Sequence, residues 1–319
     1  MPRLEVRPLT ADDLPEAATL LAERHRRHRY AQPLLSPRYE KESEAAGVLP
    51  ALDEASGAAA YRGGTMVAYV LGAPKASPVW GPNVWVEAAG TAAAEPEAVR
   101  DAYAMAAARW VDEGCKAHYA VVPATDPDLV RAWFRLGFGQ QHAHGLRSVP
   151  AARSPLPDGL VIRRAVRDDI PALAELEVAL PQHQGLSPTF SAGNLPTVEE
   201  SRQEWESDFD DDSYTTFVAV RDGVVIGSAI GCALEKSGSH TGLARPDHAG
   251  FLGFAAVAPA ARGSGAGRAL GEAVLSWCAE AGFTSAVTDW RVTNLLSSRA
   301  WPALGFEESF LRLHRLIGY

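Results

Sequence analysis

Residues Val257–Leu270 read VAPAARGSGAGRAL. An apolar strand expected over Phe251–Val257 ends here in a glycine-rich loop, and a helix expected over Gly267–Ala281 follows. Glycine lets the backbone curl so that successive N–H groups converge, and the N-terminus of a helix adds the positive end of its dipole. The stretch therefore predicts a cradle for a pyrophosphate, to which Arg262 and Arg268 add charge. The other interpretation is a flexible turn before a surface helix.

Two other nucleotide-binding motifs do not fit this loop. No Gly-Lys-Ser or Gly-Lys-Thr ends it, which excludes a Walker A P-loop. Gly263, Gly265 and Gly267 are spaced as G-x-G-x-G rather than G-x-G-x-x-G. Several strands are also expected before them, so the start of a Rossmann domain is not indicated.

The landmarks around the loop occur twice along the chain, in the same order. LEVR at residues 4–7 and DDLP at 12–15 recur as LVIR at 160–163 and DDIP at 168–171. Similarly, RAWFRLGF, which begins at Arg131, recurs as RAWPALGF from Arg299. The chain is therefore expected to be a tandem duplication of one domain.

The predicted domains are residues 1–147 and 159–319, joined by a linker at 148–158 that is rich in Pro, Ala and Ser. A length of 319 residues with 47% apolar residues is enough for two domains that each bury a core. Strands and helices mix without strict alternation in each copy. This predicts a mixed α/β (α+β) fold, with a central, mostly antiparallel mixed sheet flanked by helices.

With these motifs the chain resembles the GCN5-related N-acetyltransferase (GNAT) superfamily, in a tandem two-domain form. Arg262-x-x-Gly265-x-Gly267 looks like the acetyl-CoA pyrophosphate loop of that family, reached from a strand that ends in Val-x-Pro. The later family signature of an Asn, a small residue, an aromatic residue and Gly-Phe is matched by Asn294, Ser297, Trp301, Gly305 and Phe306. The resemblance extends over both copies, but only the second has the full set of motifs.

The resemblance implies an acetyl-CoA-dependent N-acetyltransferase whose second domain holds the cosubstrate. Backbone N–H groups of the loop would bind the pyrophosphate, and Val257 would pair its backbone with the pantetheine arm. The N–H of Ala255 would polarise the acetyl carbonyl, and Asn294 would contact the pantetheine or the region of the sulfur. The cofactor-binding residues implied in this way are Ala255, Val257, Arg262, Gly263, Ser264, Gly265, Ala266, Gly267, Arg268, Asn294, Ser297 and Trp301.

The second copy departs from the family in its acid–base residues. Phe251 stands where many members carry a Glu or His base. A subgroup that resembles the ribosomal-protein alanine acetyltransferases carries its base five residues before the Asn, and that place is Asp289. Asp289 would take the amine proton or bind a cationic substrate; the other interpretation is a strand-end Asp that caps the next turn. His240 or His248 is the reserve base, because a neutral imidazole suits that task near pH 7.

Trp301 replaces the general acid of the family, a Tyr seven residues after the Asn. An indole N–H does not protonate a thiolate, so either Ser297 or Ser298 orients the sulfur or water protonates it. Trp301 is also a candidate core residue, because Trp133 has the same place in the first copy. The expected catalytic residues are Asp289, His248, His240 and Ser297.

The expected substrate-binding residues are His183, Trp290 and Asp247. The histidines lack the spacing of metal ligands, and no metal site is expected. Eight acids lie within Glu199–Asp212, where Arg202 is the only basic residue. Such a run either attracts a cationic substrate or forms a solvated helix face.

The first copy is expected to be a degenerate domain with a structural role. At a constant offset its residues 94–100 align with the loop, where every glycine is missing and Glu95 and Glu97 would repel phosphates. Asp126 aligns with Asn294.

The composition limits the kinds of binding partner and the cellular location that are expected. The formal net charge of −9 opposes a nucleic-acid partner. No run of 18 apolar residues and no apolar leader are visible, so neither a membrane span nor a secretory signal is expected. Three cysteines are too few and too scattered for a disulfide framework, and a cytoplasmic monomer or homodimer is expected.

The function expected from the resemblance is direct acetyl transfer, in the C-terminal domain, to a primary amine on a small molecule. Two alternatives stay open: a catalytically silent acetyl-CoA-binding sensor or regulatory protein, and a protein N-terminal or lysine acetyltransferase.

Overall fold

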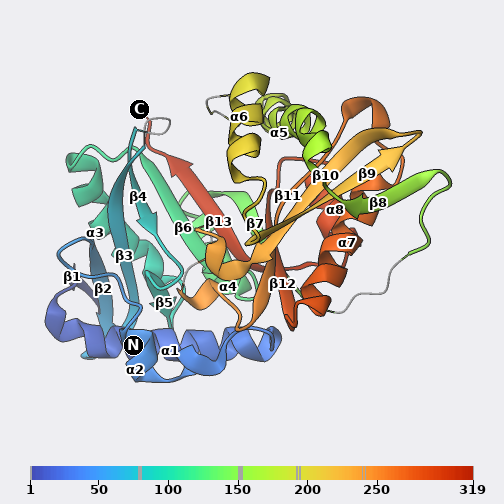
Figure 1. Ribbon diagram of the computed structural model, residues 1–319. Coiled ribbons are helices and arrows are strands. Elements are labelled where there is room, and N and C mark those ends of the chain that lie inside the picture. The colour runs from blue at the N-terminus through green and yellow to red at the C-terminus, as the bar shows by residue number, and fades with distance from the viewer. Residues whose placement is uncertain are drawn as a thin grey trace. The chain divides into compact units, whose positions relative to one another are not determined.

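The computed structural model describes residues 2–77, 81–149, 154–191, 193, 195–238, 240 and 242–318. The chain divides into two compact units (Figure 1). Unit 1 comprises Met1–His144, Thr241–Asp247 and Glu308–Tyr319, and unit 2 comprises Gly145–His240 and His248–Glu307. None of the helices in the described part of the chain has the length and apolar character that a membrane span requires.

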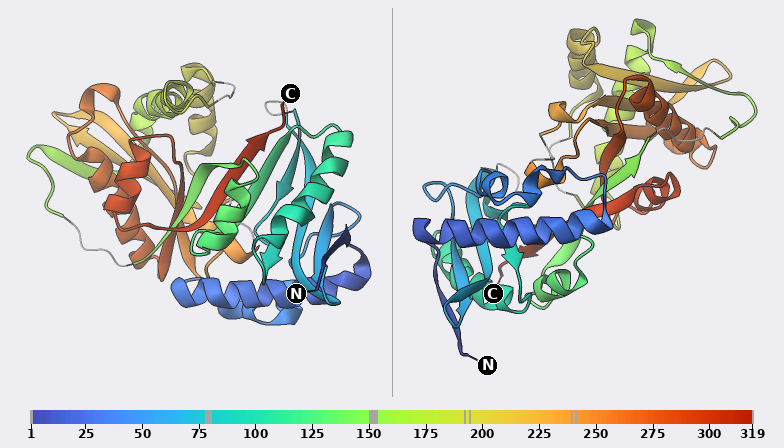
Figure 2. Two further views of the ribbon diagram at one scale, coloured as in Figure 1. Left: turned by 180° about the vertical axis from the view of Figure 1, so that it is seen from behind. Right: turned by 90° about the horizontal axis from the view of Figure 1, so that it is seen from below.

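Unit 1 is built on strands in the order β1-β2-β3-β4-β6-β13, with β5 paired to β3. Only the β4–β6 pair among these is parallel. Its elements are β1 (Leu4–Pro8), α1 (Leu14–Ala31), α2 (Glu42–Ala46), β2 (Ser56–Arg62), β3 (Thr65–Ser77), β4 (Gly81–Val86), β5 (Thr91–Ala93), α3 (Ala98–Asp112), β6 (Ala117–Pro123), α4 (Pro127–Phe134) and β13 (Glu307–Leu316). The left panel of Figure 2 shows α3 on the near face of these strands, where it packs on β2 and β3.

Unit 2 has strands in the order β12-β11-β10-β9-β8. The β11–β12 pair is parallel and the other pairs of this series are antiparallel. Its elements are β8 (Leu160–Arg164), α5 (Ile170–Gly185), α6 (Val198–Asp208), β9 (Tyr214–Arg221), β10 (Val224–Ala233), β11 (Ala249–Val257), α7 (Ala266–Glu280), β12 (Ser285–Arg291) and α8 (Ser297–Ala303). The mixed, mostly antiparallel sheet that the sequence predicts is confirmed in each unit.

The repeated sequence motifs form the same local structure in both units. Asp13 accepts hydrogen bonds from Arg7 at 2.5 and 2.7 Å, and Asp169 accepts them from Arg163 at 2.6 and 2.8 Å. Each pair ties the first strand of its unit to the turn that opens the first long helix. The charge-assisted bidentate geometry explains why the motif keeps an Arg before the double Asp.

Each unit has its own core. In unit 1, Trp110 and Trp133 are fully buried and meet the ring of Tyr103 edge-on. In unit 2, α7 lies against β10 and β11. It approaches so closely that a Cβ on Gly250 would lie 2.4 Å from the sulfur of Cys278, so glycine is required there.

The compact units group residues differently from the boundaries expected at 1–147, 148–158 and 159–319. Strand β13, the last strand of the second copy, belongs to unit 1, where it pairs with β6 from Phe310↔Pro123 to Leu316↔Ala117. Strand β7 (Gly139–Ser148) is divided, because Gly145–Ser148 belong to unit 2. Residues 150–153 of the expected linker lie outside the described residues. The domain boundaries therefore stay a prediction about the repeat in the sequence.

Strands β11 and β12 separate partway along their length, which positions the site. They pair only from Ala249↔Ser285 to Phe251↔Val287. The hydroxyl of Thr288 then donates to the carbonyl of Leu252 at 2.9 Å. Beyond that bond, the edge of β11 that faces away from β10 has no β12 partner in the described register.

Candidate active site

The glycine-rich loop has the backbone that its glycines were expected to allow. Gly263 has φ 79° and Gly265 has φ 83°, both in the left-handed region that other residues rarely adopt. Gly265 is the N-cap of α7, which begins at Ala266. The unpaired N–H groups of the first helical turn and the positive end of the helix dipole therefore lie at the loop.

A pocket of about 300 Å³, which we call the loop pocket, lies beside this loop. It is lined by Ala179, Leu180, His183, Ala255, Ala256, Val257, Ala261, Arg262, Gly263, Ser264, Gly265, Gly267, Arg268, Asn294, Leu296, Ser297, Ala300 and Trp301. Every expected cofactor-binding residue except Ala266 is in this set, and so is His183, which was expected to bind substrate. Sequence analysis missed the side of the pocket formed by α5 at Ala179 and Leu180, because apolar residues on a helix carry no signal of a ligand.

The edge of β11 at the loop pocket offers backbone groups to an extended ligand. The N–H of Ala258 donates to the carbonyl of Ile226 at 2.8 Å, on the β10 side. Because backbone groups alternate in direction along a strand, those of Val257 and Ala255 point away from β10, into the gap left by β12. This is the arrangement that backbone pairing to a linear, amide-containing chain requires.

A β-bulge precedes these residues. Ile230 pairs with Phe254 and Gly231 pairs with Leu252, so Gly253 is the extra residue of β11. Gly253 is exposed. Gly253 therefore adds no side chain of its own at the point where the gap opens, and the ring of Phe251 lies next to it.

The two arginines of the loop differ in their partners. Arg268 donates to Glu272 at 2.9 Å, and Glu272 also accepts from the backbone N–H and the hydroxyl of Ser154 at 2.8 Å each. Burial opposes ionisation of Glu272, but these donors hold its pKa below the usual value. Arg262 is exposed and has no ion pair within the described ranges, so its charge is available to a phosphate.

The start of α8 forms the far wall of the loop pocket. Asn294 is 4% exposed, and its side-chain oxygen accepts from the N–H of Leu296 at 3.2 Å. The hydroxyl of Ser297 donates to the carbonyl of Asn294 at 3.3 Å. Trp301 is 8% exposed and meets Phe306 edge-on, so it lines the pocket while it packs in the core.

Unit 1 has no counterpart of the glycine loop. The connection from β5 to α3 runs over 94–97, whereas that from β11 to α7 runs over 258–265. Unit 1 therefore lacks the glycines because its connection is shorter. The constant-offset alignment had instead suggested that other residues replace them. Glu95 accepts from Arg62 at 2.8 to 3.0 Å, and this ion pair lowers the pKa of Glu95.

Side chains occupy the strand edge of unit 1 that corresponds to the gap in unit 2. By sheet register, Thr91 and Ala93 have the places of Ala255 and Val257, because they pair with equivalent residues of the preceding hairpin. The guanidinium of Arg24 donates to the carbonyls of Thr91 and Ala88, and that of Arg27 donates to the carbonyl of Ala93 at 3.2 Å. Backbone groups at this edge are thus bonded within the unit.

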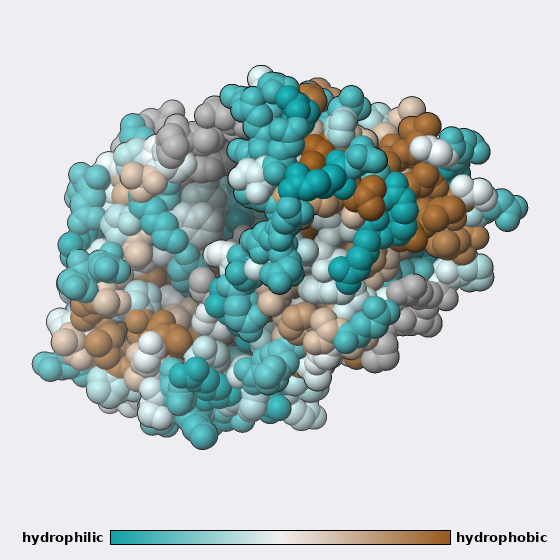
Figure 3. Space-filling view, in the orientation of Figure 1, coloured by the Kyte–Doolittle hydropathy of each residue, from teal (hydrophilic) through white to brown (hydrophobic). Residues whose placement is uncertain are grey.

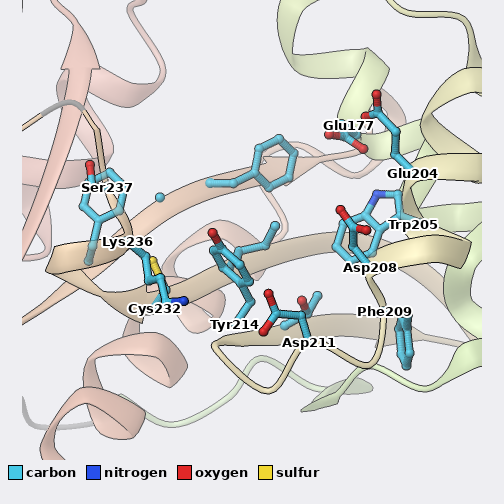
Figure 4. Close-up of a pocket in the computed structure, with 15 residues that line it drawn as sticks. Glu177, Glu204, Trp205, Asp208, Phe209, Asp211, Tyr214, Cys232, Lys236 and Ser237 are labelled. Carbon is cyan, nitrogen blue, oxygen red and sulfur yellow. The ribbon is translucent and has the colours of Figure 1, made fainter.

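A second pocket of unit 2, of about 400 Å³, lies on the same strand β11 (Figure 4). We call it the aromatic pocket. Its lining residues are Glu177, Glu204, Trp205, Asp208, Phe209, Asp211, Tyr214, Thr216, Ile230, Cys232, Lys236, Ser237, Phe251, Gly253 and Phe254. Sequence analysis found only its acidic segment, within the run Glu199–Asp212. It missed Glu177 and Tyr214, which come from separate elements.

The expected catalytic residues lie at different depths. Asp289 is partly buried on β12, two residues beyond the Phe251↔Val287 pair, so the alternation of a regular strand places it on the face of Phe251. His240 is fully buried, with its ring edge-on to Phe251 at 5.3 Å and its Nδ1 3.4 Å from the hydroxyl of Ser237. His248 is an exposed turn residue with φ 49°. None of the three lines either pocket.

Two of the expected substrate-binding residues lie away from the pockets. Trp290 is 4% exposed and packs where Gly145 leaves room, since a Cβ on Gly145 would lie 2.5 Å from the indole. Asp247 is exposed and belongs to unit 1. Within the described ranges, no group of three or more His, Cys, Asp or Glu side chains could hold a metal ion.

Comparison with known proteins matches part of the chain to one family. Residues 181–306 match the model of the acetyltransferase (GNAT) family. No curated protein matches the sequence.

Solved structures match the fold over nearly the whole chain. A GCN5-related N-acetyltransferase from Sphaerobacter thermophilus is 15% identical, with a TM-score of 0.59 over 99% of this chain and 96% of its own. The GCN5-related glucosamine N-acetyltransferase region of a fungal multi-domain GH3 β-N-acetylglucosaminidase is 14% identical, with a TM-score of 0.53 over 98% of this chain and 38% of its own. These likenesses show that the chain has the fold of these proteins.

Proposed function

We propose that this chain, residues 181–306 of which match the acetyltransferase (GNAT) family model, binds acetyl-CoA in the loop pocket and transfers the acetyl group directly to a primary amine of a small molecule. The observation that carries the proposal is the union of three features in one pocket of unit 2. The first is a loop at the start of α7 whose glycines have left-handed φ angles. The second is the available charge of Arg262, and the third is the edge of β11 that does not pair with β12.

The residues of the loop pocket fit the parts of the cosubstrate in order. N–H groups between Arg262 and Gly267 suit a pyrophosphate, because a helix N-terminus and a glycine loop together favour an anion. The outward backbone groups of Val257 suit the amides of the pantetheine arm. Bound acetyl-CoA supplies an activated acetyl thioester to this strand edge.

The N–H of Ala255 is the donor placed to stabilise the developing negative charge on the acetyl oxygen. Asp289 is the candidate base, because it lies on the same face of the sheet as Phe251. Because it lines neither pocket, it would accept the proton of the attacking amine through water. Ser297 would orient the sulfur from the start of α8.

Only unit 2 is proposed to be catalytic. The short connection at 94–97 provides no glycine cradle, and Arg24 and Arg27 bond the carbonyls that correspond to the open edge of β11. Unit 1 is then a structural domain. Cytoplasmic location, a monomer or homodimer, and the absence of nucleic-acid and membrane partners stay predictions from composition.

A silent acetyl-CoA-binding sensor or regulatory protein is the second candidate, favoured by Phe251 at the usual place of the base and by Trp301 at the usual place of the acid. Such a protein would bind acetyl-CoA and release no thiol with any amine. A protein N-terminal or lysine acetyltransferase would prefer peptides to small amines in the same assay.

Calorimetric titration of acetyl-CoA into the full chain tests the proposal through its stoichiometry. We expect one site per chain, with an affinity at least tenfold weaker in Gly267→Glu, because a carboxylate at the loop repels phosphate. The matched control is Gly139→Glu, since both glycines are free of steric conflict in this structure but only Gly267 lines the loop pocket.

Absence of binding would overturn the proposal, and so would equal affinities in the two variants. Two sites per chain would overturn the structural role of unit 1. Thiol release from acetyl-CoA with a panel of primary amines then separates the enzyme from the silent binder.

A further inference from the structure

The aromatic pocket and the loop pocket meet on strand β11. Phe251, Gly253 and Phe254 line the aromatic pocket, and the next residue, Ala255, lines the loop pocket. Consecutive Cα atoms are about 3.8 Å apart, so the two sets of lining residues adjoin on this strand. Helix α5 also lines both pockets, through Glu177 in one and Ala179 and Leu180 in the other. The exposed bulge residue Gly253 presents no side chain at the junction. A molecule in the aromatic pocket therefore has access to the strand edge where the thioester is proposed to lie.

The aromatic pocket has a strong excess of negative charge. Glu177, Glu204, Asp208 and Asp211 line it, against the single ammonium group of Lys236. Figure 4 shows Glu177, Glu204, Trp205 and Asp208 on one side of the pocket, and Cys232, Lys236 and Ser237 on the other. Glu177, Glu204 and Asp208 therefore lie away from the one basic residue. Asp211, whose pKa is lowered by hydrogen bonds from Ser213, also interacts with the charge of Lys236.

Helix α6 pairs Glu199 and Glu206 with a cation but leaves the acids of the pocket without one. Arg202 binds Glu199 at 2.8 Å and also pairs with Glu206, on the outer part of the helix. Within the described residues, no basic side chain pairs with Glu204 or Asp208. The surface over α6 is hydrophilic in Figure 3. The run of acids is thus balanced on one part of the helix and unbalanced where it faces the pocket.

The carboxylate of Glu177 is positioned by a hydrogen bond from helix α6. Its Oε2 accepts a hydrogen bond of 2.5 Å from the hydroxyl of Ser201, which is fully buried between α5 and α6. A neutral donor leaves the charge of the carboxylate in place. The pocket therefore has a positioned carboxylate as well as the exposed ones on α6.

The remaining walls of the aromatic pocket suit a ligand with an apolar or flat body. Trp205, Phe209, Tyr214 and Phe254 contribute rings, and aromatic faces attract cations as well as apolar groups. The indole N–H of Trp205 is buried and has no hydrogen-bond partner in this structure. Cys232 is 4% exposed, and burial raises its pKa to about 11, so it lines the pocket as a neutral thiol. A buried donor without a partner is costly unless a ligand satisfies it.

We propose that the aromatic pocket is the acceptor site, and that the acceptor is a small organic dication with an apolar body. One amino group reaches the strand edge beyond Gly253, and a second cationic group is held by Glu177, Glu204 and Asp208 beside Trp205. This inference rests on the proposed acetyl transfer and names its substrate class. In the transfer, the neutral amine nitrogen forms the new C–N bond and the C–S bond breaks. Nitrogen gives up one proton to the base or water, and the sulfur takes up one proton, so that the products are an amide and a thiol.

Matched amines test the second cationic group. p-Xylylenediamine is compared with 4-methylbenzylamine, which has the same ring and one amino group, by thiol release from saturating acetyl-CoA with the full chain. We expect kcat/KM to be at least about tenfold higher for the diamine, the size of effect expected from one charge-assisted hydrogen bond. Equal values for the two amines would overturn the inference.

A double substitution tests the pocket itself. Glu204→Gln with Asp208→Asn should lower kcat/KM for the diamine by about tenfold or more and change that for the monoamine less than about threefold. The control is Glu206→Gln, an acid of the same helix that pairs with Arg202 and lines no part of the pocket. Equal losses for both amines, or no loss for the diamine, would overturn the inference.

Calorimetry keeps this inference separate from the proposed function. If acetyl-CoA does not bind, the proposed function fails. If acetyl-CoA binds and p-xylylenediamine titrated alone binds the parent and the double variant equally, only the acceptor assignment fails. A diamine affinity that falls in the double variant and not in Glu206→Gln supports the assignment even without turnover.

Discussion

The guanidinium group of Arg24 donates a hydrogen bond to the backbone carbonyl of Thr91, the residue of unit 1 that has the place of Ala255 in unit 2. Arg24 itself has the place of Leu180, since each lies eleven residues after the Asp that caps its helix. Leu180 lines the loop pocket. The same position in the fold therefore faces an open pocket in one unit and carries a long side chain bonded to the strand in the other.

Arg24→Met should destabilise unit 1. Arg24 is 1% exposed, and the change removes the donors to the carbonyls of Thr91 and Ala88. We expect a loss of about 2–4 kcal/mol in the free energy of unfolding, from two buried acceptors that lose a charged donor. Urea unfolding measures it, with the exposed Arg26→Met as the control, expected to change by less than about 0.5 kcal/mol. A loss as small as the control's would contradict the account.

Asp289→Asn should lower kcat by about a hundredfold or more and change KM little, if Asp289 is the general base. Asp289 is the candidate because it lies two residues beyond Val287, which pairs with Phe251. Asp247→Asn is the control, because Asp247 belongs to unit 1. A parent-like rate at every pH would move the role to His240, His248 or water.

Asp13→Asn should make stability less sensitive to acid. The hydrogen bond from Arg7 holds the pKa of Asp13 far below its usual value, against the effect of burial, and Tyr61 and Thr10 add further donors. A folded-state pKa below the unfolded one gives stability that is present above the unfolded value and lost as pH falls. The parent should therefore lose stability between about pH 5 and pH 2, and the variant should lose less.

Thermal or urea unfolding across that pH range measures the difference. The exposed neighbour Asp12→Asn is the matched control and should retain the slope of the parent. Parallel curves for the parent and Asp13→Asn would contradict the assignment.

The buried cysteines should resist alkylation. Burial raises the pKa of Cys232 to about 11 and that of Cys278 to about 12. The thiolate is the reactive form, so iodoacetamide at pH 8 should label the folded protein at least about a hundredfold more slowly than the protein in urea. Mass spectrometry of the labelled peptides measures each site. Rapid labelling of Cys232 in the folded protein would show that the aromatic pocket opens widely.

Local motifs allowed the glycine loop and its strand edge to be predicted from the sequence. Gly263 and Gly265 have the left-handed φ that makes glycine informative, and Asn294, Ser297 and Trp301 line the same pocket as the loop. Trp290 has no such signal. Whether an aromatic residue on a strand enters a pocket or a core depends on its neighbours, and here Gly145 provides the room for its indole.

The aromatic pocket could not be predicted from local sequence patterns. Its carboxylates come from α5, α6 and the segment that follows α6, and its rings come from α6 with its C-cap, from β9 and from β11. An acidic run gives the same pattern whether it faces water or a pocket. Only the packing of Ser201 against Glu177 shows which part of α6 turns inward.

By itself, the sequence determined the repeated motifs, the mixed fold and the glycine-rich loop. Each of these rests on residues close together in the chain that require a specific backbone conformation. The tertiary structure alone decided that β13 belongs to unit 1, that Arg24 bonds the strand edge there, and that two pockets meet at Phe254 and Ala255. These depend on pairing and packing between distant segments. Many partners satisfy the same apolar or hydrogen-bonding pattern, and only the assembled fold selects among them.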